Sequence, residues 1–291
     1  MVTVDRTRGR QVFRVVNAVV LTGVVLVTLY PFVNIVARSL SDEFAIRAGK
    51  VNLVPVGFTF RTYEFVASDP TFWTNYRNTV VYTVVATAIA MLMTTCYAYV
   101  LSKRHLKGRT FLIGVAVFTM FFSGGLIPNY VLISSLGMKD TIWAIVLPNA
   151  ISVFNLLVMK AFFEGIPAEL EEAAAIDGMS TYGILLRIVL PLSKAVIATM
   201  VLFYAVSFWN SWFPAFLYMT QSDLFPVTVY LRNLIAGATT GTSVGADATD
   251  MTVATNIKAV TMVLTVLPIL TIYPFVQRYF VKGVMLGAVK G

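Results

Sequence analysis

The stretch NTVVYTVVATAIAMLMTTCYAYVLS occupies residues 78–102 and contains no Asp, Glu, Lys or Arg. A helix needs roughly 20 mostly apolar residues to cross the hydrocarbon core of a membrane, so this stretch predicts one membrane-spanning helix. The rest of the chain has the same character, since 58% of its 291 residues are hydrophobic and only 12% are charged. A soluble domain typically carries about a quarter charged residues. The sequence therefore predicts an all-α integral membrane protein.

Six apolar runs of spanning length occur along the chain, and they predict a single transmembrane domain over residues 1–291. No Asp or Glu lies in these runs, and only Lys194 interrupts one of them near its start. Gly124, Gly125 and Pro128 lie close together in the third run and predict a bend there. The six predicted transmembrane helices lie at about residues 15–37, 78–102, 110–132, 141–159, 192–219 and 259–277.

The distribution of positive charge predicts how these helices are oriented. Six spans place both chain ends on one side, and 14 of the 22 Lys and Arg residues fall on that side. Its net charge is +8, whereas the loops of the other side sum to zero. Because Lys and Arg are enriched in cytoplasmic loops, we expect both termini in the cytoplasm. This topology and contact with membrane lipid account for the pI of about 9.6, so no nucleic-acid partner is expected.

The predicted cytoplasmic loop at residues 160–191 contains the segment EGIPAELEEAAAIDG, residues 164–178. Pro167 suits the start of a helix, acidic residues favour its first turns, and Gly178 can adopt the left-handed conformation that ends it. These signals predict a helix of about ten residues. Four positions share one face at helical spacing, and their small side chains would let another backbone approach: Leu170, Ala173, Ala174 and Asp177. Taken alone, the pattern fits a protein-docking helix or a helix lying on the membrane surface.

A spaced motif in the same loop carries a family resemblance. Glu172-Ala173-Ala174, Gly178, Ile188 and Leu190-Pro191 match every fixed position of the pattern E-A-A-x3-G-x9-I-x-L-P. The chain thereby resembles the permease subunits of ATP-binding-cassette (ABC) importers, in which this EAA loop forms a coupling helix seated in a cleft of the ATPase subunit. The resemblance implies the type I ABC importer permease fold. It assigns coupling to the ATPase to Leu170, Glu172, Ala173, Ala174, Asp177 and Gly178.

Three further segments resemble carbohydrate-uptake permeases of the maltose-type class: FSGGLIP (122–128), SFWNSWFP (207–214) and KGVMLGAVKG (282–291). They favour the branch for complex or lipoprotein-delivered oligosaccharides, which includes permeases for acidic polysaccharide fragments such as alginate. The implied function is import of a carbohydrate, with oligosaccharides and acidic fragments as the leading candidates. The implied location is the bacterial cytoplasmic (inner) membrane.

The chain contains no G-x-x-x-x-G-K-[ST] phosphate loop, so it is not expected to be an enzyme or to hold a cofactor, and ATP and Mg are assigned to a partner ATPase. The lone Cys96 and the lone His105 predict no catalytic group and no metal site. A single subunit of six helices forms only one half of the transport pathway across the membrane. The resemblance therefore implies a second, homologous permease subunit in a heterodimer, an ATPase dimer and an extracytoplasmic solute-binding protein.

Polar and aromatic side chains inside the spans are candidates for the carbohydrate pathway, because an unpaired polar group in lipid is costly and usually faces protein or water. Indole rings stack on sugar rings, and amides bond hydroxyl groups. Helix packing and an interfacial aromatic belt are the alternative explanations. The candidates are Trp209, Asn210 and Trp212 in the fifth span, Asn155 in the fourth and Asn78 at the start of the second.

The predicted outer segment 222–258 is too long for a simple turn. Its Gly- and Thr-rich centre contains Gly237, Gly241 and Gly245. A loop at this position reaches into the binding protein in related maltose-type permeases, so the resemblance implies a binding-protein contact here. A flexible spacer is the alternative.

A secondary active transporter is the main rival interpretation, since it also has an inward-positive helix bundle with polar groups at mid-depth. It should show acidic residues within its spans or a repeat of broken helices, and the sequence shows neither, since no Asp or Glu occurs in the six runs. A membrane enzyme would need a cluster of titratable groups at one depth. The sequence therefore favours the ABC permease.

Overall fold

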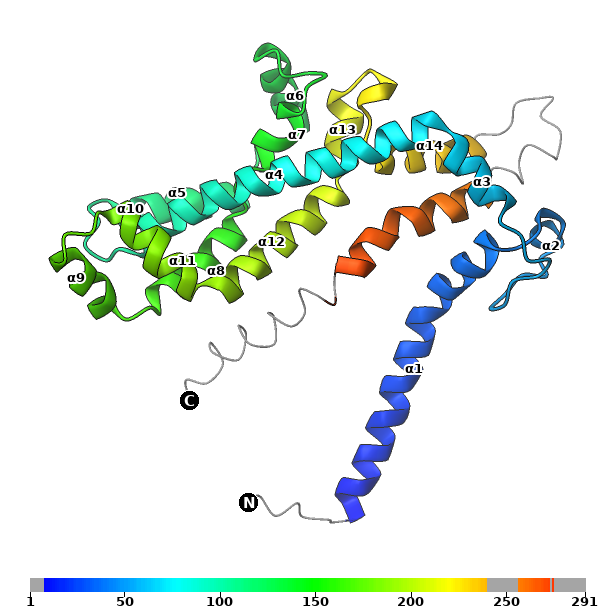
Figure 1. Ribbon diagram of the computed structural model, residues 1–291, viewed down its shortest axis with the longest axis horizontal. Coiled ribbons are helices and arrows are strands. Elements are labelled where there is room, and N and C mark those ends of the chain that lie inside the picture. The colour runs from blue at the N-terminus through cyan, green and yellow to red at the C-terminus, as the bar shows by residue number, and fades with distance from the viewer. Residues whose placement is uncertain (1–7, 240–255, 273, 275–291) are drawn as a thin grey trace. The chain divides into compact units, whose positions relative to one another are not determined.

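The computed structural model describes residues 8–239, 256–272 and 274, and every regular element within this part of the chain is helical (Figure 1). The chain divides into two compact units. Unit 1 comprises residues 1–69 and 233–266, and unit 2 comprises residues 70–232 and 267–291. The prediction of one domain over the whole chain stays a prediction.

Unit 1 contains one long helix and several short ones. Its helices are α1 (Arg8–Ser39), α2 (Glu43–Arg47) and α3 (Arg61–Ser68), and the helix Asn256–Ile272 begins in unit 1 and ends in unit 2. The loop after α2 folds back on the chain before it, because the Asp42 N–H donates to the Val56 carbonyl at 3.0 Å. Gly57 has φ +67° there, and a Cβ at this position would lie 2.7 Å from the Asp42 Cβ. Only glycine fits this close approach.

Unit 2 is a bundle built on one long helix. Its helices are α4 (Pro70–Ser102), α5 (Arg109–Phe121), α6 (Leu126–Ser135), α7 (Trp143–Val146), η1 (Leu147–Asn149), α8 (Val153–Glu164), α9 (Ala168–Ile176), α10 (Thr181–Ile184), η2 (Leu185–Val189), α11 (Leu190–Leu192), α12 (Lys194–Trp209), α13 (Phe213–Tyr218) and η3 (Ser222–Leu224). A last helix, α14 (Val227–Thr239), begins in unit 2 and ends in unit 1. The long helix α4 packs along α8 and α12, and α12 runs beside it in Figure 1. Small residues such as Ala86, Ala90 and Ala98 are fully buried on α4, which lets the neighbouring helices approach closely.

Three pairs of successive apolar helices meet at a sharp bend across a short break. The helices α5 and α6 meet at 112° across residues 122–125, where Gly125 has φ +88°. This confirms the bend predicted from the glycines and Pro128. The pair α7–η1 meets α8 at 50°, and the segment Thr181–Leu192 meets α12 at 86°. Pro191 lies just before the second of these breaks and cannot donate a helical hydrogen bond.

Each of the six predicted spans overlaps one or more described helices. Two described helices, α1 and α4, are long and apolar enough to cross a membrane, and each bent pair passes the same test when it is counted as one span. The sixth predicted span overlaps the shorter apolar helix Asn256–Ile272. Residues 273 and 275–277 of that span lie outside the described part of the chain.

Side chains of α4 hold the segment between α13 and α14, which includes the short helix η3. The Asn78 amide donates to the Asp223 carbonyl at 2.6 Å and to the Phe225 carbonyl at 3.2 Å. The Tyr82 hydroxyl donates to the Leu224 carbonyl at 2.8 Å, and the Val227 N–H donates to the Thr79 hydroxyl at 2.8 Å. In a membrane bundle, the backbone N–H and C=O groups of an irregular segment need hydrogen-bond partners of this kind.

A second polar link lies in the loop between α6 and α7. Asp140 adopts φ +55°, and its carboxylate accepts the N–H and the hydroxyl of Thr220 at 2.5 and 2.8 Å. The backbone and side-chain hydrogen bonds from Thr220 lower the pKa of Asp140. The loop is thereby fastened to the chain that follows α13.

Candidate functional site

The helix of the EAA loop, α9, forms nearly where the sequence predicts it. Pro167 is its N-cap rather than its first helical residue, and Glu169 and Glu171 occupy the first turn, near the positive end of the helix dipole. Gly178 has φ +81°, and its N–H donates to the Ala175 carbonyl at 3.1 Å. Nothing lies within 4 Å of the place of a Gly178 Cβ. The positive φ, and not a lack of space, therefore requires glycine here.

The four predicted face residues of α9 do not form one exposed surface, which corrects the sequence-based expectation. Ala174 is only 6% exposed and belongs to the apolar core formed by α4, α8 and α10–α12. Leu170, Ala173 and Asp177 are exposed, together with Glu172. The reason is that α9 is a short helix that lies on its own bundle, so the side of the helix that carries Ala174 packs inward.

Glu171 anchors α9 to α4, a role that no pattern in the sequence indicates. The Tyr99 hydroxyl donates to Glu171 Oε2 at 3.1 Å, and Lys103 forms an ion pair with the same carboxylate. The Lys103 Nζ also lies 4.1 Å from the centre of the Tyr99 ring, which is a cation–π distance. Glu169, Glu171 and Glu172 all precede the alanines. The sequence alone does not show which of the three side chains packs toward α4.

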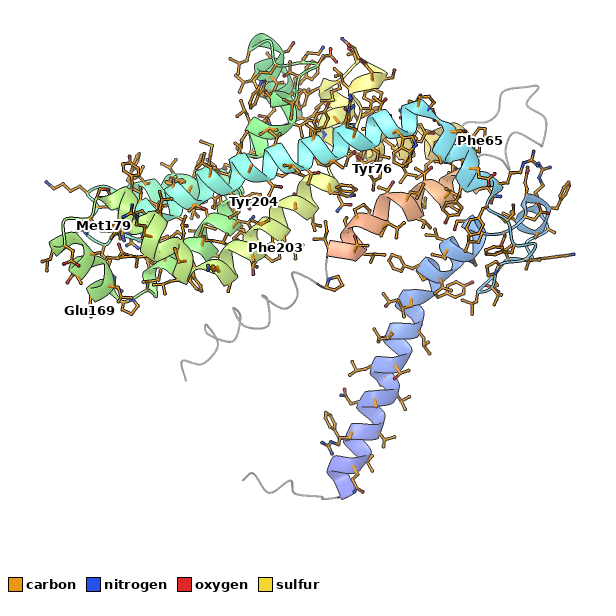
Figure 2. All side chains as sticks on the ribbon, viewed as in Figure 1. Phe65, Tyr76, Glu169, Met179, Phe203 and Tyr204 are labelled. Atoms are coloured by element: carbon orange, nitrogen blue, oxygen red, sulfur yellow. The ribbon has the colours of Figure 1, made fainter. Side chains whose placement is uncertain are left out.

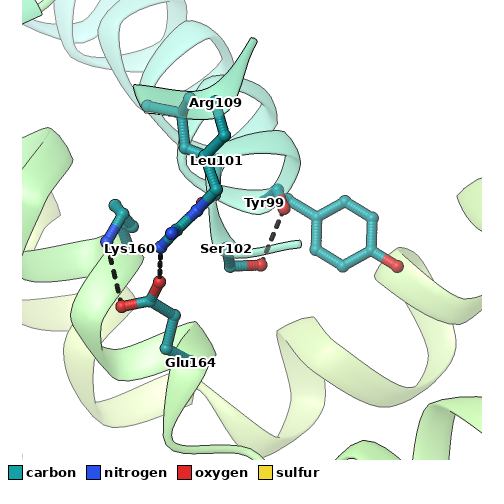
Figure 3. Close-up of polar contacts among 6 residues, drawn as sticks. All are labelled: Tyr99, Leu101, Ser102, Arg109, Lys160 and Glu164. Atoms are coloured by element: carbon teal, nitrogen blue, oxygen red, sulfur yellow. Dashed lines mark hydrogen bonds and ion pairs between the residues drawn. The ribbon is translucent and has the colours of Figure 1, made fainter. Parts of the chain in front are cut away.

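A second charged cluster fastens the helices on which α9 rests (Figure 3). Glu164 at the end of α8 pairs with Arg109 at the start of α5 and with Lys160 at 2.9 Å. The Arg109 Nε also donates to the Leu101 carbonyl at 2.8 Å. Charge-assisted bonds of this kind are stronger than neutral ones. The ends of α4, α5 and α8 are therefore tied together beside the EAA loop.

The outer side of this region presents a mixed apolar and acidic surface, which we call the α9 surface. Its members are Leu170, Glu172, Ala173, Ile176, Asp177 and Tyr182. Ile176 is 86% exposed and Tyr182 is 79% exposed. Carboxylates among these apolar side chains disfavour contact with anionic lipid. The surface therefore suits a protein partner.

The predicted pathway residues of the fifth span are separated in the structure. Trp209 is buried and packs edge-on against Tyr76, with ring centres 5.9 Å apart. The Asn210 amide donates to the Val206 carbonyl of its own helix at 2.8 Å. Trp212 lies beyond the end of α12 against Phe213, 5.5 Å between ring centres. These contacts do not place the three side chains around one common cavity.

The other two candidates for the carbohydrate pathway, Asn78 and Asn155, differ in their hydrogen bonding. Asn78 is 7% exposed, and its amide is engaged with the 223–225 backbone described above. Asn155 is 5% exposed, and its side-chain amide makes no hydrogen bond to another described residue. Asn155 lies in the first turn of α8, where Ser152 caps the helix by accepting the Asn155 N–H at 3.4 Å.

The predicted binding-protein segment is described only in part. The helix α14 continues through Gly237 to Thr239, so the helix extends further into the predicted flexible centre than expected. Gly241 and Gly245 lie outside the described residues.

Comparisons with known proteins agree on one family. The chain is 43% identical over 290 residues to protein LplC of Bacillus subtilis, covering 99% of this chain and 98% of that protein. It is 39% identical over 271 residues to the polygalacturonan/rhamnogalacturonan transport system permease protein YtcP of the same organism, covering 91% and 94% of the two chains. No protein-family model matches the chain.

A solved structure has the same fold. It is a chain of a bacterial ABC transporter involved in the import of the acidic polysaccharide alginate, with a TM-score of 0.87 and 33% sequence identity. The match covers 96% of the present chain and 100% of the other.

Proposed function

The chain belongs to the permease subunits of ABC sugar importers, and we propose that it carries an acidic oligosaccharide into the cytoplasm, driven by a separate ATPase that contacts α9. Two of the relatives with named substrates support the acidic class, because polygalacturonan and alginate are both polymers of sugar acids. The carbohydrate is released by an extracytoplasmic binding protein and crosses between this chain and a second, homologous permease subunit.

The observation that carries the proposal is the position of α9. It is anchored to α4 through Glu171 and open on its other side, where Glu172 and Ile176 are exposed. A partner that pushes or pulls the α9 surface would act on α4 through the Glu171–Lys103 pair. It would act on α12 through Ala174 and the short elements α10, η2 and α11, which include a π-helical turn of the kind often found at functional sites.

The remaining assignments follow from the family and the charge distribution. ATP and Mg are bound by the partner ATPase dimer, and this chain itself needs no cofactor. The subunit lies in the bacterial inner membrane with both termini in the cytoplasm, so that α9 faces the ATPase. The Trp209, Asn210 and Trp212 region and the segment around Gly237, Gly241 and Gly245 are proposed to contact substrate and binding protein, respectively.

A reconstitution experiment tests the proposal. The chain, its partner permease, the ATPase and the binding protein are placed in proteoliposomes, and uptake of short galacturonate and alginate oligomers is measured with and without ATP inside. We expect ATP-dependent uptake of at least one acidic oligomer and no ATP hydrolysis by the purified chain alone. Uptake driven by an ion gradient without ATP would instead support the secondary transporter.

A deletion tests the binding-protein contact separately. Removal of residues 238–244 should leave membrane insertion and basal ATP hydrolysis unchanged and should reduce the stimulation by loaded binding protein. Unchanged stimulation would identify this segment as a spacer.

A further inference from the structure

A cavity of about 310 Å³ opens between the start of α8 and the second half of α12, entirely within unit 2. This volume lies at the lower end of the range for small-molecule sites. Both helices belong to bent spans, and the break between η1 and α8 forms one wall. The cavity is lined by Pro148, Asn149, Ile151, Ser152, Asn155, Phe203, Tyr204, Ser207 and Phe208.

The floor of the cavity is buried and rigidly held. Tyr204 is 3% exposed and Phe208 is 8% exposed, and their rings are stacked with centres 6.3 Å apart. The Tyr204 hydroxyl accepts the Ser152 N–H at 2.9 Å and bonds the Thr94 hydroxyl at 2.6 Å. These bonds fix the broken backbone at Ser152 to both α12 and α4. Figure 2 labels Tyr204 on α12, with Phe203 beside it.

Asn155 supplies the one buried side-chain amide of this floor within the described residues. Its neighbours Asn149 and Tyr204 use their polar groups within the protein, since the Asn149 amide donates to the Ile145 carbonyl at 3.3 Å. The Asn155 side chain, 95% buried, lines the cavity without a hydrogen-bond partner among the described residues. The amide is open to the cavity, so its donor and acceptor are available for a ligand.

The other lining residues indicate the chemistry of that ligand. No Asp, Glu, Lys or Arg lines the cavity as the structure describes it. A carboxylate placed there would lose its water without gaining a positive partner. Phe203 is 37% exposed at the rim and presents an aromatic surface, and Ser207 adds a hydroxyl. The site suits a ring with hydroxyl groups and a partly apolar face.

We propose that this cavity binds one sugar ring of the transported carbohydrate through its hydroxyl groups, with Asn155 as the specificity-determining side chain. This inference rests on the proposed import of an oligosaccharide and adds that the present subunit itself holds one ring. The carboxylate of a uronic acid ring points out of the cavity. A lipid acyl chain is a poorer occupant, because it would leave the Asn155 amide unpaired.

The first test compares uptake kinetics in the reconstituted complex, with short galacturonate oligomers as the probe. Asn155→Leu keeps the branched shape of the side chain and removes both hydrogen-bonding groups. We expect KM for the oligomer to rise about tenfold, which corresponds to the loss of about 1.4 kcal/mol of binding. Asn17→Leu is the matched control, because Asn17 is exposed on α1 and does not line the cavity. Equal KM values for Asn155→Leu and wild type would overturn the proposal.

The second test needs no change at Asn155, so it stands even if Asn155→Leu does not fold. The only cysteine, Cys96, is replaced by serine, and Ser207→Cys then places a thiol at the rim. We expect galacturonate oligomers to slow labelling of this thiol in the assembled complex held with a non-hydrolysable ATP analogue. Labelling slowed by added phospholipid and not by the oligomer would overturn the proposal and identify the cavity as a lipid site.

The two proposals fail in different ways. If the wild-type complex imports no oligomer in the presence of ATP, the proposed function fails. If the wild type imports the oligomer but Asn155→Leu leaves KM unchanged, or phospholipid alone slows the labelling, only the sugar site in this cavity fails.

Discussion

The helices α1 and α4 are almost equal in length and apolarity but differ completely in burial. They contain 32 and 33 residues, and their spans have mean hydropathies of 2.2 and 1.9. In the most apolar window of α1 no residue is buried, whereas 44% of that window in α4 is buried. Helices of nearly equal hydropathy can therefore differ in how much of their surface is buried within their own unit.

Side-chain size separates the two helices. The buried side of α4 is rich in Ala and Thr, which permit close packing and bond across helices. In α1 the exposed residues are mainly Val and Leu, and Gly23 has nothing within 4 Å of its Cβ position. Small and hydroxyl-bearing positions thus mark the helix on which the bundle is built.

The largest expected effect comes from enlarging a small residue on α4. Ala90 is fully buried in a cluster with Tyr204 and Phe208, so Ala90→Leu should overpack the bundle and cost roughly 1–3 kcal/mol. Gly23→Leu on α1 meets open space and should leave thermal stability unchanged. Unfolding of both variants, followed by intrinsic fluorescence in detergent, checks this contrast. Similar losses of stability in both would show that α1 is as closely packed as α4.

A smaller effect is expected from one interhelical hydrogen bond. Thr94 is 0% exposed and bonds the Tyr204 hydroxyl, so Thr94→Val should cost about 0.6–1 kcal/mol. Thr28 on α1 bonds only the Val24 carbonyl of its own helix at 2.8 Å. Thr28→Val should therefore lower Tm by less than Thr94→Val. The reverse order would mean that the Thr94 hydroxyl does not stabilise the bundle.

The smallest effect on stability distinguishes the two sides of α9. Glu171 faces α4, whereas Glu172 is exposed. Glu171→Gln should lower stability by about 0.5 kcal/mol, because partly exposed ion pairs contribute little. Glu172→Gln should leave Tm unchanged and reduce binding of the ATPase. If Glu171→Gln alone reduces ATPase binding, the assignment of the two sides is wrong.

Much of the fold could be predicted from local signals. The apolar runs mark all six helical regions, and Gly124, Gly125 and Pro128 mark the sharpest bend. Gly178 marks the end of α9, because a positive φ leaves few other residues possible. The EAA motif identifies the family, which comparison with known permeases confirms.

The contacts between distant segments could not be predicted in the same way. The sequence cannot show that Asn78 holds the 223–225 backbone while Asn155 faces a cavity, since both are single amides in apolar runs. It also cannot show that Ala174 packs inward on α9. These contacts depend on how the bent spans pack against one another, and no local sequence pattern predicts that packing.

The central claim is that α9 couples this chain to a separate ATPase, and Gly178→Val tests it most directly against Gly137→Val. Both glycines have positive φ, +81° and +66°, with nothing near their Cβ positions, so valine strains each backbone by roughly 1–2 kcal/mol. Only Gly178 ends α9. The measurement is ATP-dependent oligosaccharide uptake by complexes that contain equal amounts of inserted chain. We predict a loss of about tenfold for Gly178→Val and near wild-type uptake for Gly137→Val, whereas equal uptake by both would contradict the account.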